Sequence, residues 1–183
     1  MADRNRILTL ETLPAIERER VSELDEIGRS IEGKRGIELL TSLKREKLDH
    51  GPYRDVTLFE AANRIMSDLV ILKGIRWLLD EKVFPFDAYS VEFGNENRNG
   101  FDIRAEQGGK TLVGEAFNVA PSFYPVKRRH AAGKLEKHGG DADWRIILVN
   151  KDARTRAIKL KKPHDIRYFA VDMVSGIGEP CGP

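Results

Sequence analysis

The chain has a single cysteine, Cys181, among its 183 residues. One cysteine cannot form a disulfide within the chain or build a cysteine-ligated zinc site, so the disulfide-rich and zinc-finger classes are excluded. Long apolar runs are missing too, and no stretch approaches the roughly 20 apolar residues that span a bilayer. The opening sequence Met-Ala-Asp-Arg-Asn-Arg lacks the apolar segment of a secretory signal peptide. We therefore expect a cytoplasmic protein.

Charged residues are plentiful, at 33% of the chain, but their two signs are unevenly distributed. The formal net charge is +2. Residues 51–122 carry 8 basic and 11 acidic side chains, whereas residues 123–183 carry 13 basic and 7 acidic ones. A polyanion attracted to the basic segment would meet the carboxylates of the acidic segment beside it. The alternative is that the basic segment only keeps the protein solvated.

The most informative part of the chain has the pattern of a β-hairpin. Residues 101–106 and 111–117 each alternate apolar and polar side chains, and the turn sequence Gln-Gly-Gly-Lys lies between them. This hairpin register places Asp102 directly opposite Glu115, with Cβ atoms roughly 5 Å apart. Two like charges at that separation destabilise a sheet. A hard divalent cation such as magnesium removes the penalty, because carboxylate oxygens are its natural ligands.

The alternative is a solvated carboxylate face, with Arg104 and Lys110 supplying the positive charge. The other face of the hairpin is apolar and must pack against something. Its predicted pairs are Phe101 with Ala116, Ile103 with Gly114 and Ala105 with Leu112. Val113 and Phe117 also make the carboxylate face partly apolar, which favours a cleft over open surface.

Hydrophobic periodicity predicts the remaining elements. The predicted helices are residues 11–27, 37–48, 57–82 and 125–138. The predicted strands are residues 88–93, 101–106, 111–117, 144–150 and 167–174. The third helix is apolar almost all round, so we expect it to be buried. Its narrow polar stripe consists of Glu60, Asn63, Arg64 and Ser67.

The order of these elements predicts an α/β fold with a mixed central β-sheet flanked by helices. We expect residues 53–183 to form this core. Residues 1–52 would form an N-terminal helical arm that serves dimerisation or clamps a substrate.

This order, with one acid in the second strand and another in the third, resembles the PD-(D/E)XK nuclease superfamily, which includes restriction endonucleases. The resemblance covers roughly residues 57–150, and its motifs are Phe-Asp-Ile at 101–103 and Gly-Glu-Ala-Phe at 114–117. It implies a restriction-endonuclease-like core in which Asp102 and Glu115 bind magnesium or manganese. Glu60 on the preceding helix would add a metal ligand. The implied activity is metal-dependent hydrolysis of phosphodiester bonds in DNA.

The chain departs from the family pattern at Phe117, where the family has a lysine. That lysine positions or deprotonates water and offsets charge on the phosphate, and phenylalanine can do neither. In some members the lysine has moved to the following helix, which here carries Lys127 and Lys134, two turns apart on one face with His130. We expect Lys127, nearer the helix start, to serve ahead of Lys134. The alternative is a degenerate site whose helix only contacts phosphates.

Other residues have competing roles. The helix side chains expected to bind nucleic acid are Lys127, Arg128, Arg129, Lys134 and Lys137. Glu60 has an alternative role as a cap on the Thr57 backbone N–H. Glu92 and Glu96 compete with it as a third acid. The basic run from Arg154 to Lys162 would form a further phosphate contact.

The resemblance therefore predicts a DNA endonuclease, a hydrolase that works as a homodimer if both strands are cut. Two alternatives stay open. One is a catalytically degenerate nucleic-acid-binding module on the same fold. The other is a protein-interaction or regulatory subunit, for which the helical arm is the main support.

Overall fold

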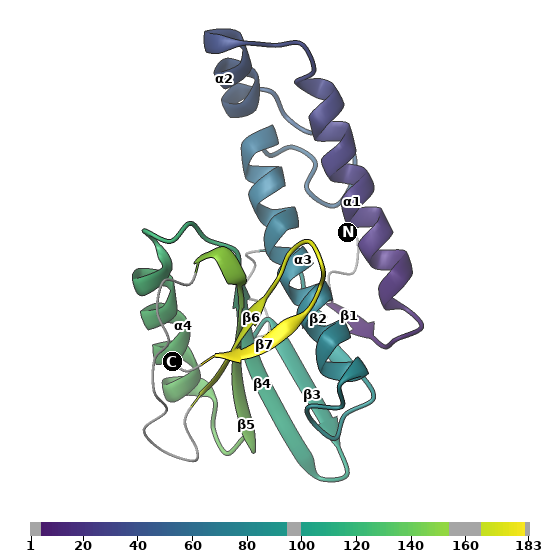
Figure 1. The fold of residues 1–183 in the computed structure, drawn as a ribbon, viewed down its shortest axis with the longest axis vertical. Helices are drawn as coiled ribbons and strands as arrows, with labels where there is room; N and C mark the ends of the chain where they lie inside the picture. Colours follow the sequence, from purple (N-terminus) through teal and green to yellow (C-terminus); the bar gives the residue numbers. More distant parts are fainter. Residues whose placement is uncertain (1–4, 95–99, 154–165, 182–183) are drawn as a thin grey trace.

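The computed structural model describes residues 5–94, 100–153 and 166–181. In these residues the chain forms a mixed α/β fold with one seven-stranded sheet and four α-helices (Figure 1). The strands lie in the sheet in chain order: β1 (Asn5–Leu8), β2 (Tyr89–Glu92), β3 (Ile103–Gln107), β4 (Lys110–Phe117), β5 (Trp144–Asn150), β6 (Arg167–Val171) and β7 (Gly178–Cys181). The helices are α1 (Leu13–Ser30), α2 (Gly36–Arg45), α3 (Leu58–Asp80) and α4 (Tyr124–His138). The predicted α/β class with a mixed sheet is confirmed.

The sheet is antiparallel at both ends and parallel in the middle. Strands β1 to β4 form an antiparallel meander, β4, β5 and β6 are parallel, and β7 runs antiparallel to β6. Helix α4 makes the crossover from β4 to β5. The hairpin register is confirmed, because Ile103 pairs with Gly114 and Ala105 with Leu112. The regular pairing ends at Ile103, so the predicted Asp102–Glu115 pair lies just beyond it.

Two hydrophobic cores cover the two faces of the sheet, because successive strand residues point to opposite sides. On one face, Leu112 and Leu148 pack with the buried residues of α3. On the other face, Val113 and Val149 pack with α4, which contributes Leu135. The prediction of a buried helix is confirmed for α3, which has apolar residues on every side and lies between the sheet and α1.

The hairpin departs from the prediction at Phe101. Sequence alternation placed this ring opposite Ala116 on the α3 side, but it packs in the other core with Val113 and Phe117. That prediction was wrong because regular strand geometry begins only at Ile103. The alternation of faces therefore does not extend back to residue 101.

Both edge strands escaped the sequence analysis. Strand β1 is four residues long and lies outside any alternating run, and β7 contains Pro180, which is tolerated at a sheet edge. The last predicted strand was also too long, since β6 ends at Val171. It stops there because the Asp172 carboxylate accepts hydrogen bonds from the backbone N–H groups of Val174 and Ser175.

The first 45 residues attach to the sheet in two ways. Strand β1 pairs with β2, and α1 packs along α3 through Leu13, Ile16 and Ile27. Figure 1 shows α1, α2 and the first half of α3 extending together beyond the sheet. The proposed division of the chain at residue 52 stays a prediction.

A buried polar cluster joins α1 to α3. Arg20 of α1 is 1% exposed, and its Nε lies 2.9 Å from Oδ2 of Asp68 in α3. The Tyr53 hydroxyl also donates to Oδ2, and the Gly94 backbone N–H donates to Oδ1 at 3.2 Å. Burial raises the pKa of Asp68 to about 6, although the Arg20 charge opposes this shift. The cluster therefore ties the helical extension to the end of β2.

Gly74 should be essential to the packing of α3. An added Cβ would lie 2.5 Å from Leu148 Cδ1 and 3.3 Å from Val171 Cγ2, both in buried side chains. We expect Gly74→Ala to lower the free energy of unfolding by about 1–3 kcal/mol, because the helix must move off the sheet. Urea denaturation measures this.

The matched control is Gly28→Ala in α1, where no heavy atom lies within 4 Å of the added Cβ. This change should leave stability unchanged or raise it by up to about 1 kcal/mol, since alanine favours helix over glycine. Equal stabilities for the two variants would contradict the proposed contact.

Candidate active site

A cavity of about 610 Å³ opens between α3, the β3–β4 hairpin and α4. Its charged and titratable lining residues are Asp102, Glu115, Lys127, His130 and Lys134. The structure therefore brings both predicted carboxylates and both candidate lysines together in one cavity. Helix α3 contributes Asn63 and Ser67 to the opposite wall.

The two carboxylates are positioned by the hairpin backbone. Asp102 lies immediately before β3, and its Oδ2 accepts a hydrogen bond from the Ala116 backbone N–H at 2.9 Å. Glu115 is in the middle of β4, on the α4 side of the sheet, and is only 8% exposed. Because Ala116 follows Glu115 in β4, this hydrogen bond holds the Asp102 carboxylate beside Glu115. The relative position of the two acids therefore depends on the hairpin register.

Burial makes this pair difficult to ionise. It raises the pKa of Glu115 to about 7, and the nearby charge of Asp102 raises it further in the same direction, whereas Lys134 opposes the shift. Burial also raises the pKa of Asp102, against the effects of the Ala116 N–H and of Lys134. Glu115 is therefore only partly ionised near neutral pH, although Lys134 lies beside it. A bound cation would favour the ionised form of both carboxylates.

Lys134 provides the nearest side-chain cation. Its Nζ lies 2.8 Å from Glu115 Oε1 and 5.7 Å from the centre of the Phe101 ring. Lys127 lines the same cavity and lowers the pKa of Asp102 more weakly than Lys134 does. Lys134 is the lysine beside Glu115, because it follows Ala131 on the part of α4 that packs against the sheet. Which of the two lysines serves in catalysis stays a prediction.

Phe117 is a core residue. It is 8% exposed, and its ring lies 6.3 Å from that of Tyr124 at the start of α4. The position two residues after Glu115, which carries lysine in the nuclease family, is thus held by a side chain that packs between β4 and α4. The cation beside Glu115 comes from the helix instead.

The other expected acids lie in different places. Glu60 is exposed and pairs with Arg64, while its backbone N–H donates to the Thr57 hydroxyl at 3.2 Å. Glu92 is buried on β2 next to Asp102, whose pKa it raises. Glu96 and the run from Arg154 to Lys162 lie outside the described residues.

The remaining basic residues of α4 are Arg128, Arg129 and Lys137. Arg129 and Lys137 are exposed, and Arg128 is half-buried. Their role in binding nucleic acid stays a prediction.

The donor set fits magnesium better than a metal that needs a full protein cage. Among the described residues there is no group of three or more His, Cys, Asp or Glu side chains that could bind a metal ion. Magnesium needs no such group, because it commonly binds one or two carboxylates and completes its shell with water and substrate phosphates. Asp102 and Glu115 meet that requirement.

Sequence reasoning missed three polar residues near the site. Asn63 and Ser67 stood in the predicted polar stripe of α3 but were given no role, and Asn118, which follows β4, also lines the cavity. The Ser67 hydroxyl accepts a hydrogen bond from the Asn118 backbone N–H at 3.4 Å. A narrow polar stripe on an otherwise apolar helix was the available signal for the first two.

Comparisons with known proteins do not assign the chain to a family, so its classification rests on its fold and its site. No family model matches the chain, and a search of curated proteins found no match. None of the helices in the described ranges has the length and apolar character needed to cross a membrane. The chain is defined by its class, a mixed α/β protein with a carboxylate pair and a lysine in one cavity.

Glu115→Gln should change how stability depends on pH. The folded pKa of Glu115, about 7, lies above its ordinary value of 4.5, so the stability due to its protonated form is complete below about pH 4.5 and is lost as pH rises through 7. Glutamine resembles the protonated acid at every pH. We expect the variant to exceed wild type by on the order of 1–3 kcal/mol at pH 8 and by little at pH 5. Urea denaturation at several pH values measures the difference.

Glu106→Gln is the matched control, because Glu106 is exposed on the same hairpin. Its pH profile should parallel that of wild type. A Glu115→Gln profile that also parallels wild type would show that Glu115 titrates normally in the folded protein.

Proposed function

We propose that the chain is a metal-dependent endonuclease with a restriction-endonuclease-like core, which hydrolyses phosphodiester bonds in DNA. The observation that carries this proposal is the Asp102–Glu115 pair, set in a cavity with Lys134 at 2.8 Å from Glu115. The order α3, β2, β3, β4, α4, β5 supports it, since this is the succession of elements on which the resemblance rests.

Each residue of the site has a chemical task under this proposal. Asp102 and Glu115 would bind magnesium. The bound ion supplies a Lewis acid that polarises the scissile phosphate and lowers the pKa of water. Lys134 provides the ammonium group that Phe117 cannot, and it stabilises negative charge that develops on the phosphate. Lys127 places a second positive charge on the same wall.

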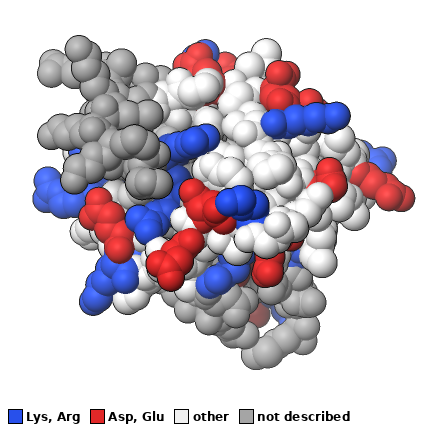
Figure 2. All heavy atoms as spheres, turned by 90° about the horizontal axis from the view of Figure 1, so that it is seen from below, with Lys and Arg blue, Asp and Glu red and all other residues white. Residues whose placement is uncertain are grey.

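DNA would approach along α4. This helix carries five lysine and arginine residues and one acid, Glu136. By contrast, acidic and basic side chains are interspersed at the end of the molecule away from α2 (Figure 2). A phosphate backbone would therefore be attracted more strongly to α4 than to that end, and its binding should weaken with salt. Because one site cuts one strand, we propose a homodimer for cleavage of both strands.

The first test is DNA cleavage with magnesium or manganese on supercoiled, linear and branched substrates. Asp102→Asn and Lys134→Met should each lower the cleavage rate by about 100-fold or more, because each removes charge stabilisation from the transition state. Lys110→Met at the distal end of the hairpin is the control, since Lys110 pairs with Asp143 away from the cavity. Cleavage that persists undiminished in Asp102→Asn, or is absent from wild type on every substrate, would overturn the proposal. DNA binding unaffected by EDTA without cleavage would identify a binding module instead.

The second test measures the metal without DNA. Manganese should raise the unfolding temperature of wild type at pH 8, with a stabilisation of about 2.7 kcal/mol when its concentration is 100 times the dissociation constant. Asp102→Asn should lose this effect, while Glu106→Gln should retain it. Equal stabilisation of wild type and Asp102→Asn would place the metal elsewhere.

A further inference from the structure

A second cavity, of about 580 Å³, lies at the carboxyl ends of the parallel strands and shares Asn118 with the first. Its lining comes from the residues that follow β4, β5 and β6. The carboxyl ends of parallel strands are a common place for ligands, because the chain leaves the sheet there in several loops. The two cavities are therefore neighbouring parts of one concave surface.

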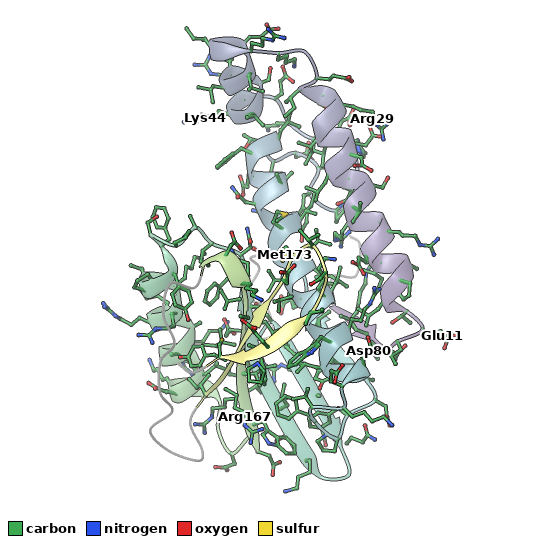
Figure 3. The ribbon with its side chains drawn as sticks, viewed as in Figure 1. Glu11, Arg29, Lys44, Asp80, Arg167 and Met173 are labelled. Atoms are coloured by element: carbon green, nitrogen blue, oxygen red, sulfur yellow. The ribbon has the colours of Figure 1, made fainter. Side chains whose placement is uncertain are left out.

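One part of the second cavity is apolar. Met66 of α3, Val119 after β4, and Met173 and Val174 after β6 contribute to its lining. Figure 3 shows Met173 in the loop between β6 and β7, beside α3. Methionine side chains adapt their shape to a flat apolar surface. This wall suits an aromatic ring.

The other part of the lining contains the carboxylates of Asp152 and Asp172, which hydrogen bonds within the protein hold in place. Asn150 is 2% exposed, and its amide bonds to both backbone groups of Val119, at 2.9 and 3.0 Å. The same Asn150 donates to Asp152 Oδ1 at 2.7 Å. Asp172 Oδ1 accepts from the Val174 and Ser175 N–H groups, and these bonds lower the pKa of Asp172. The Ser175 side chain also hydrogen-bonds to Asp172. A carboxylate has about four lone-pair sites, so both groups can accept further hydrogen bonds.

This combination selects a particular kind of ligand. Lys151 also lines the cavity, but it pairs with Glu179 at 3.5 Å. An anionic group would therefore be repelled by Asp152 and Asp172 more than it is attracted by Lys151. A flat ring that carries N–H donors would satisfy both the apolar wall and the carboxylate acceptors. Among DNA bases, adenine, cytosine and guanine carry exocyclic amino groups, whereas thymine has none.

We infer that the second cavity is a subsite for an unpaired nucleobase with an exocyclic amino group, next to the phosphate bound in the first cavity. The inference rests on the proposed function and deepens it. A base inside a duplex cannot reach such a cavity, so the substrate would be single-stranded, branched or locally unpaired DNA. The sharing of Asn118 by the two cavities places base and phosphate on adjoining surfaces.

The test is equilibrium binding of deoxycytidine, deoxyadenosine and thymidine in EDTA, followed by saturation-transfer NMR. These nucleosides carry no phosphate, so the measurement needs neither metal nor cleavage. Wild type should bind deoxycytidine and deoxyadenosine about tenfold or more tightly than thymidine. The double variant Asp152→Asn/Asp172→Asn should lose the preference, because asparagine keeps Oδ1 for the internal bonds but removes the carboxylate charge. Asp143→Asn, near the other end of the sheet, should behave as wild type.

Absence of discrimination by wild type, or a preference that survives in the double variant, would overturn the subsite. If Asp102→Asn abolishes cleavage and the double variant keeps the wild-type base preference at the cut, the nuclease stands and the subsite fails. If nucleoside preference depends on Asp152 and Asp172 but no DNA is cut, the subsite stands and the nuclease fails.

Discussion

The packing of α3 directly on the sheet is the contact on which the rest of this structure depends. It is close because Gly74 has no side chain facing Leu148 and Val171. The same helix bonds to α1 through Asp68 and presents Ser67 to the first cavity. A displacement of α3 would therefore loosen the helical extension and open the wall of the candidate site together. The packing of the sheet, the attachment of α1 and the geometry of the candidate site all depend on α3, because this helix contacts each of them.

Asp68 and the Asp102–Glu115 pair differ in how the protein balances their charge. Asp68 bonds to the Arg20 guanidinium, the Tyr53 hydroxyl and the Gly94 N–H. A buried carboxylate with this many donors is satisfied by the protein itself. Glu115 pairs with Lys134, and Asp102 accepts a hydrogen bond from the Ala116 N–H. These two acids lie side by side in a cavity with fewer donors than Asp68 has, so they are the better candidate for binding a cation. Carboxyl groups with raised pKa values in a cavity are typical of functional sites.

Local sequence patterns were enough to predict much of the fold and half of the candidate site. The alternation on either side of the glycine turn predicted the β3–β4 register, and the apolar periodicity predicted a buried α3. These features depend on neighbours in the chain, which is why they can be read without the tertiary structure. The pattern predicts the wrong side for Phe101. Regular strand geometry begins only at Ile103, and the Phe101 ring packs in the core on the α4 side of the sheet.

The sequence by itself determined the β3–β4 register, in which Ile103 pairs with Gly114, and so the closeness of Asp102 to Glu115. Only the tertiary structure decided which lysine lies beside Glu115: α4 packs with Ala131 and Leu135 on the sheet, and this orientation brings Lys134 to Glu115. It also assembled the second cavity from α3 and three separate strand ends. The reason is physical. Hairpin pairing follows from spacing along the chain, whereas the approach of a helix to a sheet depends on side-chain packing between distant segments.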